Sequence, residues 1–475
     1  MMKMPESYRR FSQTVLLAVI SAVSVSPRIA AGAQPGSLDT SFNPGAGVDQ
    51  SVFSMAVQGD GKIVIGGDFT LVNQLSRNRI ARLGSDGLVD PGFDPGLGAD
   101  DLVSAVAIQS NKVIIAGFFT TVDGTARGSI ARLNSNGSLD TGFDPGVGAD
   151  GPVLALAVQS DGKILLGGLF TTIDGVPRGN IARLNGDGSV DSSFDPGTGA
   201  TGESFSTVNA LALQSDGKVI LGGTFTNVNG VSRSHVARLH ANGNVDAAFN
   251  PAVGVAGGGL LAGINTLRIQ SDGKIVLGGD FTSVSGMART NLARLNSNGS
   301  LDANFNPGTG ADSAVSSLAV QGNGKILISG FFTHVDGTPR NYVARLNSGG
   351  SLDTGFDPGL GASDAAYVTA LQADGKVLIG GAFTTFDGTP RRGIARLEGD
   401  VVSPGPQLRN PRRQGNMFSV TVATMTGKNY VLEFKDALGG SAWTALPPVP
   451  GDGTDKTLSD PSAASPNRFY RVRVD

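Results

Sequence analysis

The chain has 475 residues, of which 70 are glycine, 40% are apolar and only 16% are charged. This composition is too apolar for a disordered chain and too rich in glycine for a helical one, so it predicts a turn-rich all-β protein. The absence of cysteine excludes disulfides and zinc–thiolate sites, and the net charge of −3 disfavours nucleic-acid binding, which needs a basic surface.

Residues 1–33 have the pattern of a secretory signal peptide. A basic start is followed by an apolar stretch at 14–25 and by the small residues Ala-Gly-Ala at 31–33. Twelve apolar residues are too few to span a bilayer, and an uncleaved anchor is the alternative to a cleaved signal. Cleavage would leave Gln34 as the first residue and a net charge of −6. We therefore expect a secreted or cell-surface protein with no membrane span in the mature chain.

Two motifs recur seven times in a fixed phase. The tripeptide Ala-Arg-Leu recurs with spacings of 50, 51, 55, 56, 51 and 51 residues. It begins at Ala81, Ala131, Ala182, Ala237, Ala293, Ala344 and Ala395. A motif close to G-K-I-L-L-G-G-x-F-T precedes each tripeptide, with its phenylalanine at Phe69, Phe119, Phe170, Phe225, Phe281, Phe332 and Phe383. Such self-similarity identifies a repeat protein that uses most of its length in one body.

The third unit indicates the structure of each repeat. Short apolar runs at 153–159 and 164–170 predict two strands joined by a Ser-Asp-Gly turn. Residues 181–185 predict a third strand and residues 190–194 a fourth, which an Asp-Pro-Gly sequence ends. Four antiparallel strands in about fifty residues is the pattern of a β-propeller blade.

The predicted fourth strand is out of phase with the other three. Its motif, S-L-D-x-x-F, occurs first at 37–42, before any complete unit, and no copy follows the last unit, which ends at Leu397. Its phenylalanines are Phe42, Phe93, Phe143, Phe194, Phe249, Phe305 and Phe356. The sequence therefore predicts that residues 37–42 form the outer strand of the last blade and close the ring. An open array of seven units is the alternative.

The motifs S-L-D-x-x-F-D-P-G, S-D-G-K-[IV]-[LIV]-[LI]-G-G-x-F-T and R-x-x-[IVL]-A-R-L resemble those of the bacterial delta-60 repeat family of β-propellers. The resemblance covers residues 36–397. It implies a seven-bladed propeller, which we place at residues 34–400, in an exported protein. It implies a fold more than a function.

The repeat ends at Asp400, and a Pro-rich linker is predicted at 401–406. Residues 407–475 alternate apolar and polar residues in three runs, which predicts a small β-sandwich with Trp443 in its core. These runs are 418–423, 430–434 and 469–474. The landmarks Y-V-L-E-F-K-D-A-L, W-T-A-L, G-D-G-T and R-F-Y-R-V-R resemble a C-terminal β-domain of secreted bacterial proteins. The basic charge of this segment fits docking to an acidic surface or a secretion partner. The alternative is a solvated face of the sandwich or a lid on the propeller.

Candidate catalytic and metal-binding residues are few. The histidines His235, His240 and His334 have no metal-site spacing, and serine-nucleophile and phosphate-loop motifs are absent from the sequence. Turns such as Asn134–Asp140 carry oxygen ligands that suit calcium, but Asn-Gly is also a preferred hairpin turn. We expect no cofactor, with calcium as the alternative.

One arginine follows the second strand of every unit and suggests a candidate binding rim. These arginines are Arg77, Arg127, Arg178, Arg233, Arg289, Arg340 and Arg391. If the first strand is innermost, all seven lie on one ring face and offer an anion- or glycan-binding rim. Alternatively, each arginine braces its own blade with a recurring acid, such as Asp123, Asp174, Asp336 or Asp387.

Function should lie where the copies differ. The connections at 198–208 and 252–264 are enlarged, and they fall on the arginine face. Glu203, Phe205 and His334 are therefore further binding candidates. The leading hypothesis is a monomeric, non-enzymatic scaffold that holds a protein or polysaccharide at the cell surface on one propeller face. The alternative is a lyase or glycosidase with carboxylates at the central channel. A channel lined only by small residues, such as Ala155, Ala157, Ala210 and Ala212, would exclude it.

Overall fold

The computed structural model describes residues 34–202, 206–251, 254–258, 262–400, 408–424, 426–436, 443–463 and 468–474. Within these residues the regular secondary structure is all β-strand, so the predicted all-β class is confirmed. The predicted signal peptide at 1–33 and linker at 401–406 lie outside the described residues. No helix in the described part of the chain is long and apolar enough to cross a membrane.

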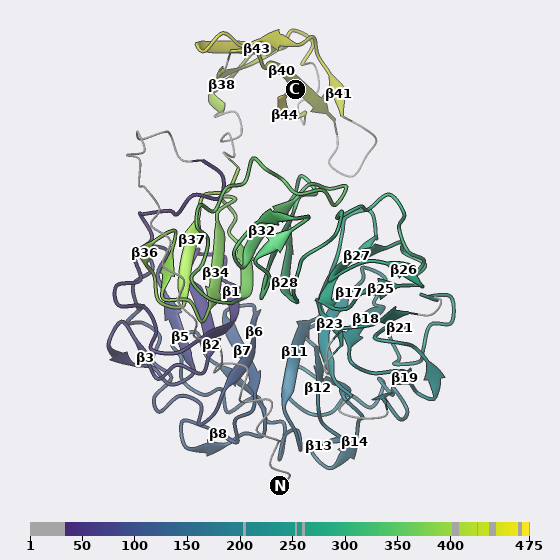
Figure 1. The fold of residues 1–475 in the computed structure, drawn as a ribbon. Helices are drawn as coiled ribbons and strands as arrows, with labels where there is room; N and C mark the ends of the chain where they lie inside the picture. Colours follow the sequence, from purple (N-terminus) through teal and green to yellow (C-terminus); the bar gives the residue numbers. More distant parts are fainter. Residues whose placement is uncertain are drawn as a thin grey trace, which may run out of the picture. The chain divides into compact units, whose positions relative to one another are not determined.

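Seven equivalent antiparallel sheets of three strands form the blades of a β-propeller (Figure 1). The first strands are β1 (Val52–Val57), β6 (Val103–Gln109), β11 (Val153–Val158), β17 (Val208–Leu213), β23 (Gly263–Ile269), β28 (Val315–Val320) and β33 (Ala366–Leu371). The second strands are β2 (Ile63–Gly67), β7 (Lys112–Gly117), β12 (Ile164–Gly168), β18 (Val219–Gly223), β24 (Ile275–Asp280), β29 (Ile326–Gly330) and β34 (Val377–Gly381). The third strands are β5 (Ile80–Leu83), β10 (Ile130–Leu133), β15 (Ile181–Leu184), β21 (Val236–Leu239), β27 (Leu292–Leu295), β32 (Val343–Leu346) and β37 (Ile394–Leu397).

A two-residue hairpin connects the second and third strands of every blade. Its turn is tight because residues such as Asp174 and Gly175 both adopt positive φ, as a type I′ turn requires. The hairpins are β3 (Leu71–Val72) with β4 (Leu75–Ser76), β8 (Thr121–Val122) with β9 (Thr125–Ala126), β13 (Thr172–Ile173) with β14 (Val176–Pro177), β19 (Asn227–Val228) with β20 (Val231–Ser232), β25 (Ser283–Val284) with β26 (Met287–Ala288), β30 (His334–Val335) with β31 (Thr338–Pro339), and β35 (Thr385–Phe386) with β36 (Thr389–Pro390).

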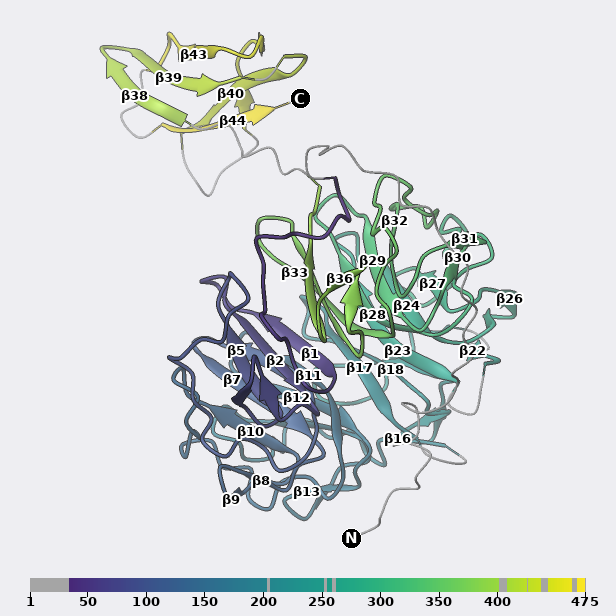
Figure 2. The same ribbon diagram turned by 60° about the vertical axis from the view of Figure 1, so that its left-hand side comes forward.

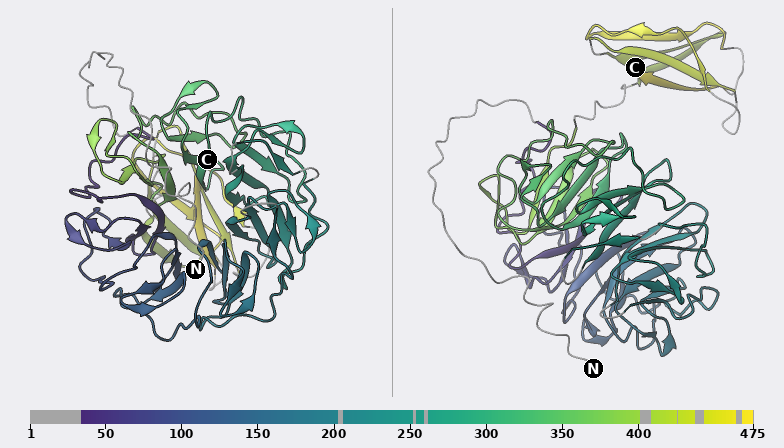
Figure 3. Two further views of the ribbon diagram at one scale, coloured as in Figure 1. Left: turned by 60° about the horizontal axis from the view of Figure 1, so that its bottom comes forward. Right: turned by 45° about the vertical axis from the view of Figure 1, so that its right-hand side comes forward.

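The first strand of each blade is innermost, as predicted. Each first strand pairs with the second strand on one edge, and it contacts the first strands of the two neighbouring blades around the ring. The last of these contacts joins β33 to β1, so the ring is closed (Figures 2 and 3). The open-array alternative is therefore wrong.

The predicted fourth strand is shorter than the sequence suggested. In the third blade it is a single β-bridge between Leu184 and Val190, and a turn follows at once. The turn forms because the Asp191 carboxylate accepts hydrogen bonds from the amide and hydroxyl of Ser193. These bonds compete with further β-pairing to the third strand. Each blade thus consists of three strands and one bridged segment rather than four full strands.

The paired glycines of the second strand allow close packing between blades. A Cβ atom on Gly167 would lie 2.6 Å from Cγ1 of Val208, which belongs to the first strand of the next blade. A Cβ atom on Gly168 would overlap the carbonyl oxygen of Pro152. A side chain at Gly167 would therefore separate two blades that are packed at core density, and one at Gly168 would disturb the pairing of the first two strands within its own blade.

The arginine of Ala-Arg-Leu links each blade to the next. In the third blade, Arg183 is buried, and its Nε donates to Oδ2 of Asp191 over 2.6 Å. Lys163 Nζ lies 2.8 Å from the same oxygen, and the guanidinium stacks 4.9 Å from the ring centroid of Phe194. Arg183 Nη1 then donates to the carbonyl oxygen of Ala241 in the fourth blade over 2.8 Å. The arginine–aspartate pairs and the arginine–phenylalanine stacks recur in all seven blades.

The N-terminal segment completes the seventh blade, which confirms the predicted closure. Leu38 forms a β-bridge with Leu397, equivalent to the bridge that ends every other blade. Arg396 Nε donates to Oδ2 of Asp39 over 2.6 Å, and Nη1 donates to the carbonyl oxygen of Ser85 in the first blade over 2.6 Å. The seam is therefore bonded like any junction inside the ring.

Residues after 407 form two antiparallel sheets that share one apolar core. The first sheet contains β38 (Leu408–Gln414), β39 (Met417–Ala423) and β43 (Asp455–Asp460). The second contains β40 (Asn429–Lys435), β41 (Thr444–Ala445), β42 (Val449–Pro450) and β44 (Phe469–Val474). The core consists of Val420, Val422, Tyr430, Leu432 and Leu458.

Trp443 does not fill this core, contrary to the sequence prediction. Its indole is half-buried, with the Arg471 guanidinium 4.4 Å and Lys435 Nζ 5.0 Å from its ring centroid. The tryptophan therefore makes cation–π contacts at the edge of the second sheet, while Tyr430 takes the buried aromatic position.

Candidate functional site

The connections that enter and leave each blade meet on one ring face, which we call the hairpin face. In the third blade, Ala149 before the first strand bridges Ile173 of the hairpin that follows the second strand. Equivalent bridges join Val48 to Val72, Ala99 to Val122, Ala311 to Val335 and Ala362 to Phe386. The hairpins that carry the seven predicted rim arginines and the described ends of the two enlarged connections therefore lie on the same face, as the strand order predicted.

Each rim arginine bonds to its own backbone. Arg178 Nη1 donates to the carbonyl oxygen of Pro177 over 2.7 Å, and only 11% of its side chain is exposed. The same bond to the preceding carbonyl recurs at Arg77, Arg127, Arg233, Arg289, Arg340 and Arg391. The Nε atom of each is buried and has no hydrogen-bond partner among the described residues. A donor set turned inward in every copy is typical of a structural role in the blade.

The acidic partners expected for these arginines have another role. Asp174 accepts a hydrogen bond from the amide of Val147 over 3.1 Å, so it fixes the connection that enters the blade. Asp123, Asp336 and Asp387 do the same in their blades. The nearest acid to Arg178 is Asp195, with Nη1 and Oδ1 4.0 Å apart. Each blade does contain an arginine–aspartate pair, but the arginine is the one in Ala-Arg-Leu. In the third blade its aspartate lies eight residues later, in the pair of Arg183 with Asp191.

The two enlarged connections replace a recurring aspartate. In the second blade, Asp100 accepts bonds from the amide and hydroxyl of Thr120 over 2.8 and 2.7 Å. The fourth and fifth blades have Thr201 and Ala256 at this position, and there short strands β16 (Ala200–Thr201) and β22 (Val255–Ala256) pair with the hairpins instead. The candidates Glu203 and Phe205, with residues 252–253 and 259–261, lie outside the described residues.

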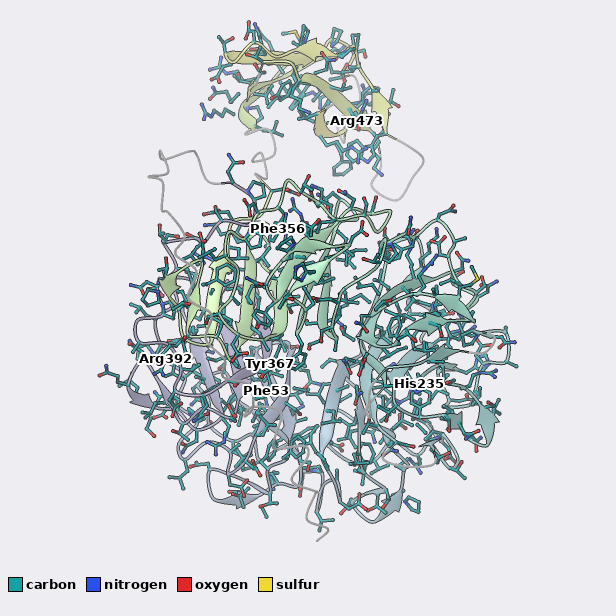
Figure 4. The ribbon with its side chains drawn as sticks, in the orientation of Figure 1. Phe53, His235, Phe356, Tyr367, Arg392 and Arg473 are labelled. Carbon is teal, nitrogen blue, oxygen red and sulfur yellow. The ribbon has the colours of Figure 1, made fainter. Side chains whose placement is uncertain are left out.

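The histidines lie apart in the fold. The exposed His334 has Nδ1 3.1 Å from Oδ2 of Asp312, which places it at a hairpin of the sixth blade. His235 is half-buried in the fourth blade, and burial lowers its pKa (Figure 4). His240 lies 3.7 Å from Asp246. Within the described residues, no group of three or more histidine or acidic side chains is arranged to hold a metal ion.

Two positions near the ring axis differ strongly among the copies. One is the second residue of the innermost strand, or the third in β23, which begins one residue earlier, and the other directly follows the paired glycines of the second strand. The first set is Phe53, Ser104, Leu154, Asn209, Asn265, Ser316 and Tyr367. The second set is Asp68, Phe118, Leu169, Thr224, Asp280, Phe331 and Ala382. Because the neighbouring positions repeat almost unchanged to satisfy the fold, this variation marks a surface on which the copies are not equivalent.

Three of these variable residues form an axial aromatic cluster at the hairpin face. The rings of Phe53 and Tyr367 are stacked with centroids 4.7 Å apart and planes 3° from parallel. Phe331 lies 5.6 Å from Tyr367 in a tilted arrangement. All three side chains are half-buried and come from adjacent blades. Figure 4 shows Phe53 and Tyr367 together near the centre of the ring. Stacked aromatic rings that keep solvent access are a common feature of ligand-binding sites.

Carboxylates flank this cluster. Burial raises the pKa of Asp68, although its Oδ1 accepts a 2.7 Å hydrogen bond from the amide of Ser51. Burial, with the negative charges of Asp364 and Asp68, raises the pKa of Tyr367 to about 12. The Tyr367 phenol therefore stays neutral at physiological pH and can donate a hydrogen bond. The cluster thus combines apolar ring faces, a hydroxyl donor and carboxylate acceptors.

The sequence prediction missed this cluster because it relied on shared motifs. The signal was present in the printed sequence: aligning the seven copies shows aromatic residues at positions where other blades carry serine, asparagine or alanine. Phe53 and Tyr367 also show that large side chains lie on the innermost strands. A channel lined only by small residues would have excluded the enzyme alternative, and this condition is not fulfilled.

The chain is similar to several solved structures and to one family model. No curated protein matches the chain. Two solved structures match over most of both chains: Sqt1 from Chaetomium thermophilum, at 13% identity, 82% and 97% coverage and a TM-score of 0.32, and a glycoside hydrolase, at 13% identity, 91% and 95% coverage and a TM-score of 0.26. A bifunctional GH43-CE protein from Bacteroides eggerthii matches at 13% identity, with 93% and 64% coverage and a TM-score of 0.23.

One family model matches in seven successive segments, each of which runs from the turn after an innermost strand toward the end of its blade. The matched residues are 58–93, 109–143, 159–194, 214–249, 270–305, 321–356 and 372–400, more than half of the chain. The chain therefore belongs to the β-propeller family described as a domain of unknown function, DUF5122.

Proposed function

We propose that the protein is an exported, non-enzymatic binding scaffold that holds a carbohydrate chain on its hairpin face, against the axial aromatic cluster. The stacked rings of Phe53 and Tyr367 carry the proposal, because the pair is only half-buried and the apolar C–H face of a sugar ring packs well on an aromatic ring. The carboxylates of Asp68 and Asp364 and the Tyr367 phenol offer partners for sugar hydroxyls. A protein partner on the same face is the alternative occupant.

The location of the protein is part of this proposal. Export would follow from the basic start and short apolar stretch of residues 1–33, with cleavage after Ala33. Polysaccharides outside the cytoplasm are then the accessible ligands. Mass spectrometry of the protein from the culture medium and periplasm should find a chain that begins at Gln34.

Binding is tested first on a glycan array and then by affinity gel electrophoresis with the soluble polysaccharides that the array identifies. Tyr367→Ala should weaken binding by about tenfold or more, since aromatic stacking and a hydrogen bond are lost together. Leu88→Ala is the matched control, because Leu88 is exposed on a turn at the opposite ring face. Equal retention by Tyr367→Ala and the unaltered protein would contradict the proposal, as would the absence of any glycan ligand.

A glycosidase or lyase remains a second candidate, favoured by one observation. Burial raises the pKa of Asp68, as is usual for a carboxylic acid that donates a proton in glycoside cleavage. Against it, Asp68 and Asp364 each accept a backbone amide hydrogen bond of 2.7 Å, a geometry that also suits a structural carboxylate. Release of reducing ends or unsaturated products from a bound polysaccharide, abolished by Asp68→Asn, would establish the enzyme in place of the scaffold.

A further inference from the structure

One blade departs from the other six at a position on the innermost strand. The fifth residue of that strand is alanine in six blades, at Ala56, Ala107, Ala157, Ala212, Ala319 and Ala370. In the fifth blade, where β23 begins one residue earlier, the equivalent residue is Arg268. Most of these alanines pack against the core of the neighbouring blade, where no long side chain fits. An arginine at this position must leave that core.

The structure shows where the Arg268 side chain goes. Arg268 is exposed, while Leu267 before it is buried in the core. Strand β23 pairs with β24 on one edge, and the ring axis lies beyond its other edge. A side chain that leaves the core at the free edge of this strand faces the ring axis, and Arg268 Nη1 donates to the carbonyl oxygen of Leu267 over 2.8 Å.

Arg268 differs from the Ala-Arg-Leu arginines in its partners. Each of those seven arginines has an aspartate within hydrogen-bond distance. Arg268 forms no ion pair with any residue that the structure describes, and the surrounding protein desolvates it enough to lower its pKa. Arginine keeps its charge even so, and a guanidinium with four remaining donors and no counterion favours an anion.

We propose that Arg268 forms an anion-binding site on the ring axis that takes a single carboxylate, sulfate or phosphate group. The planar guanidinium matches the paired oxygens of such a group, and the other six blades place only an alanine at the equivalent position. The partly desolvated surroundings strengthen the attraction relative to an arginine on the outer surface.

The anion has two possible sources. Arg268 lies three residues along the strand from Asn265, the equivalent of Phe53 in the fifth blade, which is about 10 Å of extended chain. A small inorganic anion could occupy the site alone, or an acidic sugar of a chain bound at the axial aromatic cluster could reach it. The first case is independent of the proposed function, and the second rests on it.

The test measures the binding of two probes to the mature protein by isothermal titration calorimetry at low ionic strength. The probes are sodium sulfate and an oligogalacturonate. Arg268→Ala restores the residue of the other six blades, so the fold should be retained, and circular dichroism and thermal unfolding check this. Arg392→Ala is the charge-matched control, since Arg392 is exposed at the outer edge of the seventh blade (Figure 4).

We expect Arg268→Ala to weaken sulfate binding by about tenfold or more, and Arg392→Ala to leave it unchanged. Sulfate could fail to bind while oligogalacturonate binds. If Arg268→Ala then weakens oligogalacturonate binding and Arg392→Ala does not, the acidic sugar is the source of the anion. Tyr367→Ala should weaken the oligogalacturonate but not sulfate, which separates this site from the aromatic cluster. The proposal is overturned if neither probe binds, or if Arg268→Ala binds both as tightly as the unaltered protein.

Discussion

Asp39, near the start of the described chain, and Arg396, on the last strand of the propeller, form a buried ion pair of 2.6 Å between Oδ2 and Nε. The pair joins residues 357 positions apart and is the counterpart of the pair of Asp191 with Arg183 inside the third blade. Asp39→Asn should lower the free energy of unfolding by about 3 kcal/mol, because it leaves the buried Arg396 without its counterion. Urea denaturation measures this loss, and Asp187→Asn, at an exposed turn, should change little by comparison.

The closure can also be removed entirely. Deletion of residues 37–42 should expose β37 as a free edge, so hydrogen exchange should accelerate first in the seventh blade, in the amides of β34 and β37. The third blade, whose own bridge at Leu184 is intact, is the internal reference. Uniform exchange across the blades, or unchanged stability, would contradict the assignment of these residues as the closing segment.

The seven aspartates that pair with the Ala-Arg-Leu arginines predict a loss of stability in acid. Burial alone would raise the pKa of Asp246, but hydrogen bonds from Lys218, the Ala248 amide and Arg238 outweigh it and lower the pKa to about 2. The pKa is lowered in the same way at Asp39, Asp90, Asp140, Asp191, Asp302 and Asp353. A depressed folded-state pKa stabilises the protein above the ordinary value of 3.8, and this stabilisation is lost as the pH falls toward about 2.

The free energy of unfolding, measured by urea denaturation at successive pH values, should therefore fall steeply below about pH 4. Asp246→Asn removes one titrating group, so its stability should start lower and fall less steeply across the same interval. A variant whose acid profile is parallel to that of the unaltered protein would show that these carboxylates do not govern the acid transition.

Asp400 occupies a place that a backbone carbonyl fills elsewhere. In the fifth blade, Arg294 Nη1 donates to the carbonyl oxygen of Ser348 in the next blade over 2.6 Å. The equivalent arginine of the sixth blade is Arg345, and its Nη2 donates instead to Oδ1 of Asp400, which follows β37, over 2.7 Å. Asp400→Ala should cost about 2 kcal/mol of stability, since the buried guanidinium loses an acceptor. Asp400→Asn keeps an acceptor oxygen and should cost less, and equal losses in the two variants would argue against this hydrogen bond.

The repeats made the ring predictable because period, motif phase and strand order are all carried by local sequence. The displaced copy at 37–42 even predicted the bridge between Leu38 and Leu397. The fourth strand was overestimated because its alternating residues resemble a strand, whereas the Asp191 side chain bonds the backbone two residues on and starts a turn.

The candidate site was less predictable, because proximity in the sequence does not determine which side chains meet. Asp174 lies four residues before Arg178, but the positive φ values of the hairpin turn direct it to the amide of Val147. The contact of Phe53 with Tyr367 depends on ring closure, which places the first and last blades side by side. Only a comparison of the copies with one another would have selected these positions.

The last prediction separates a structural arginine ring from a binding rim. Arg178 is largely buried, its Nη1 bonds the Pro177 carbonyl, and its Nε is buried without a partner among the described residues. Arg178→Met keeps most of the packing volume, so it should change stability by no more than about 1 kcal/mol, whereas Arg178→Ala should cost about 2 kcal/mol through lost packing. Neither substitution should alter the affinity for a glycan that Tyr367→Ala weakens. Calorimetry on the two Arg178 variants checks this, and a marked loss of affinity in a well-folded Arg178→Met variant would restore the rim as a binding surface.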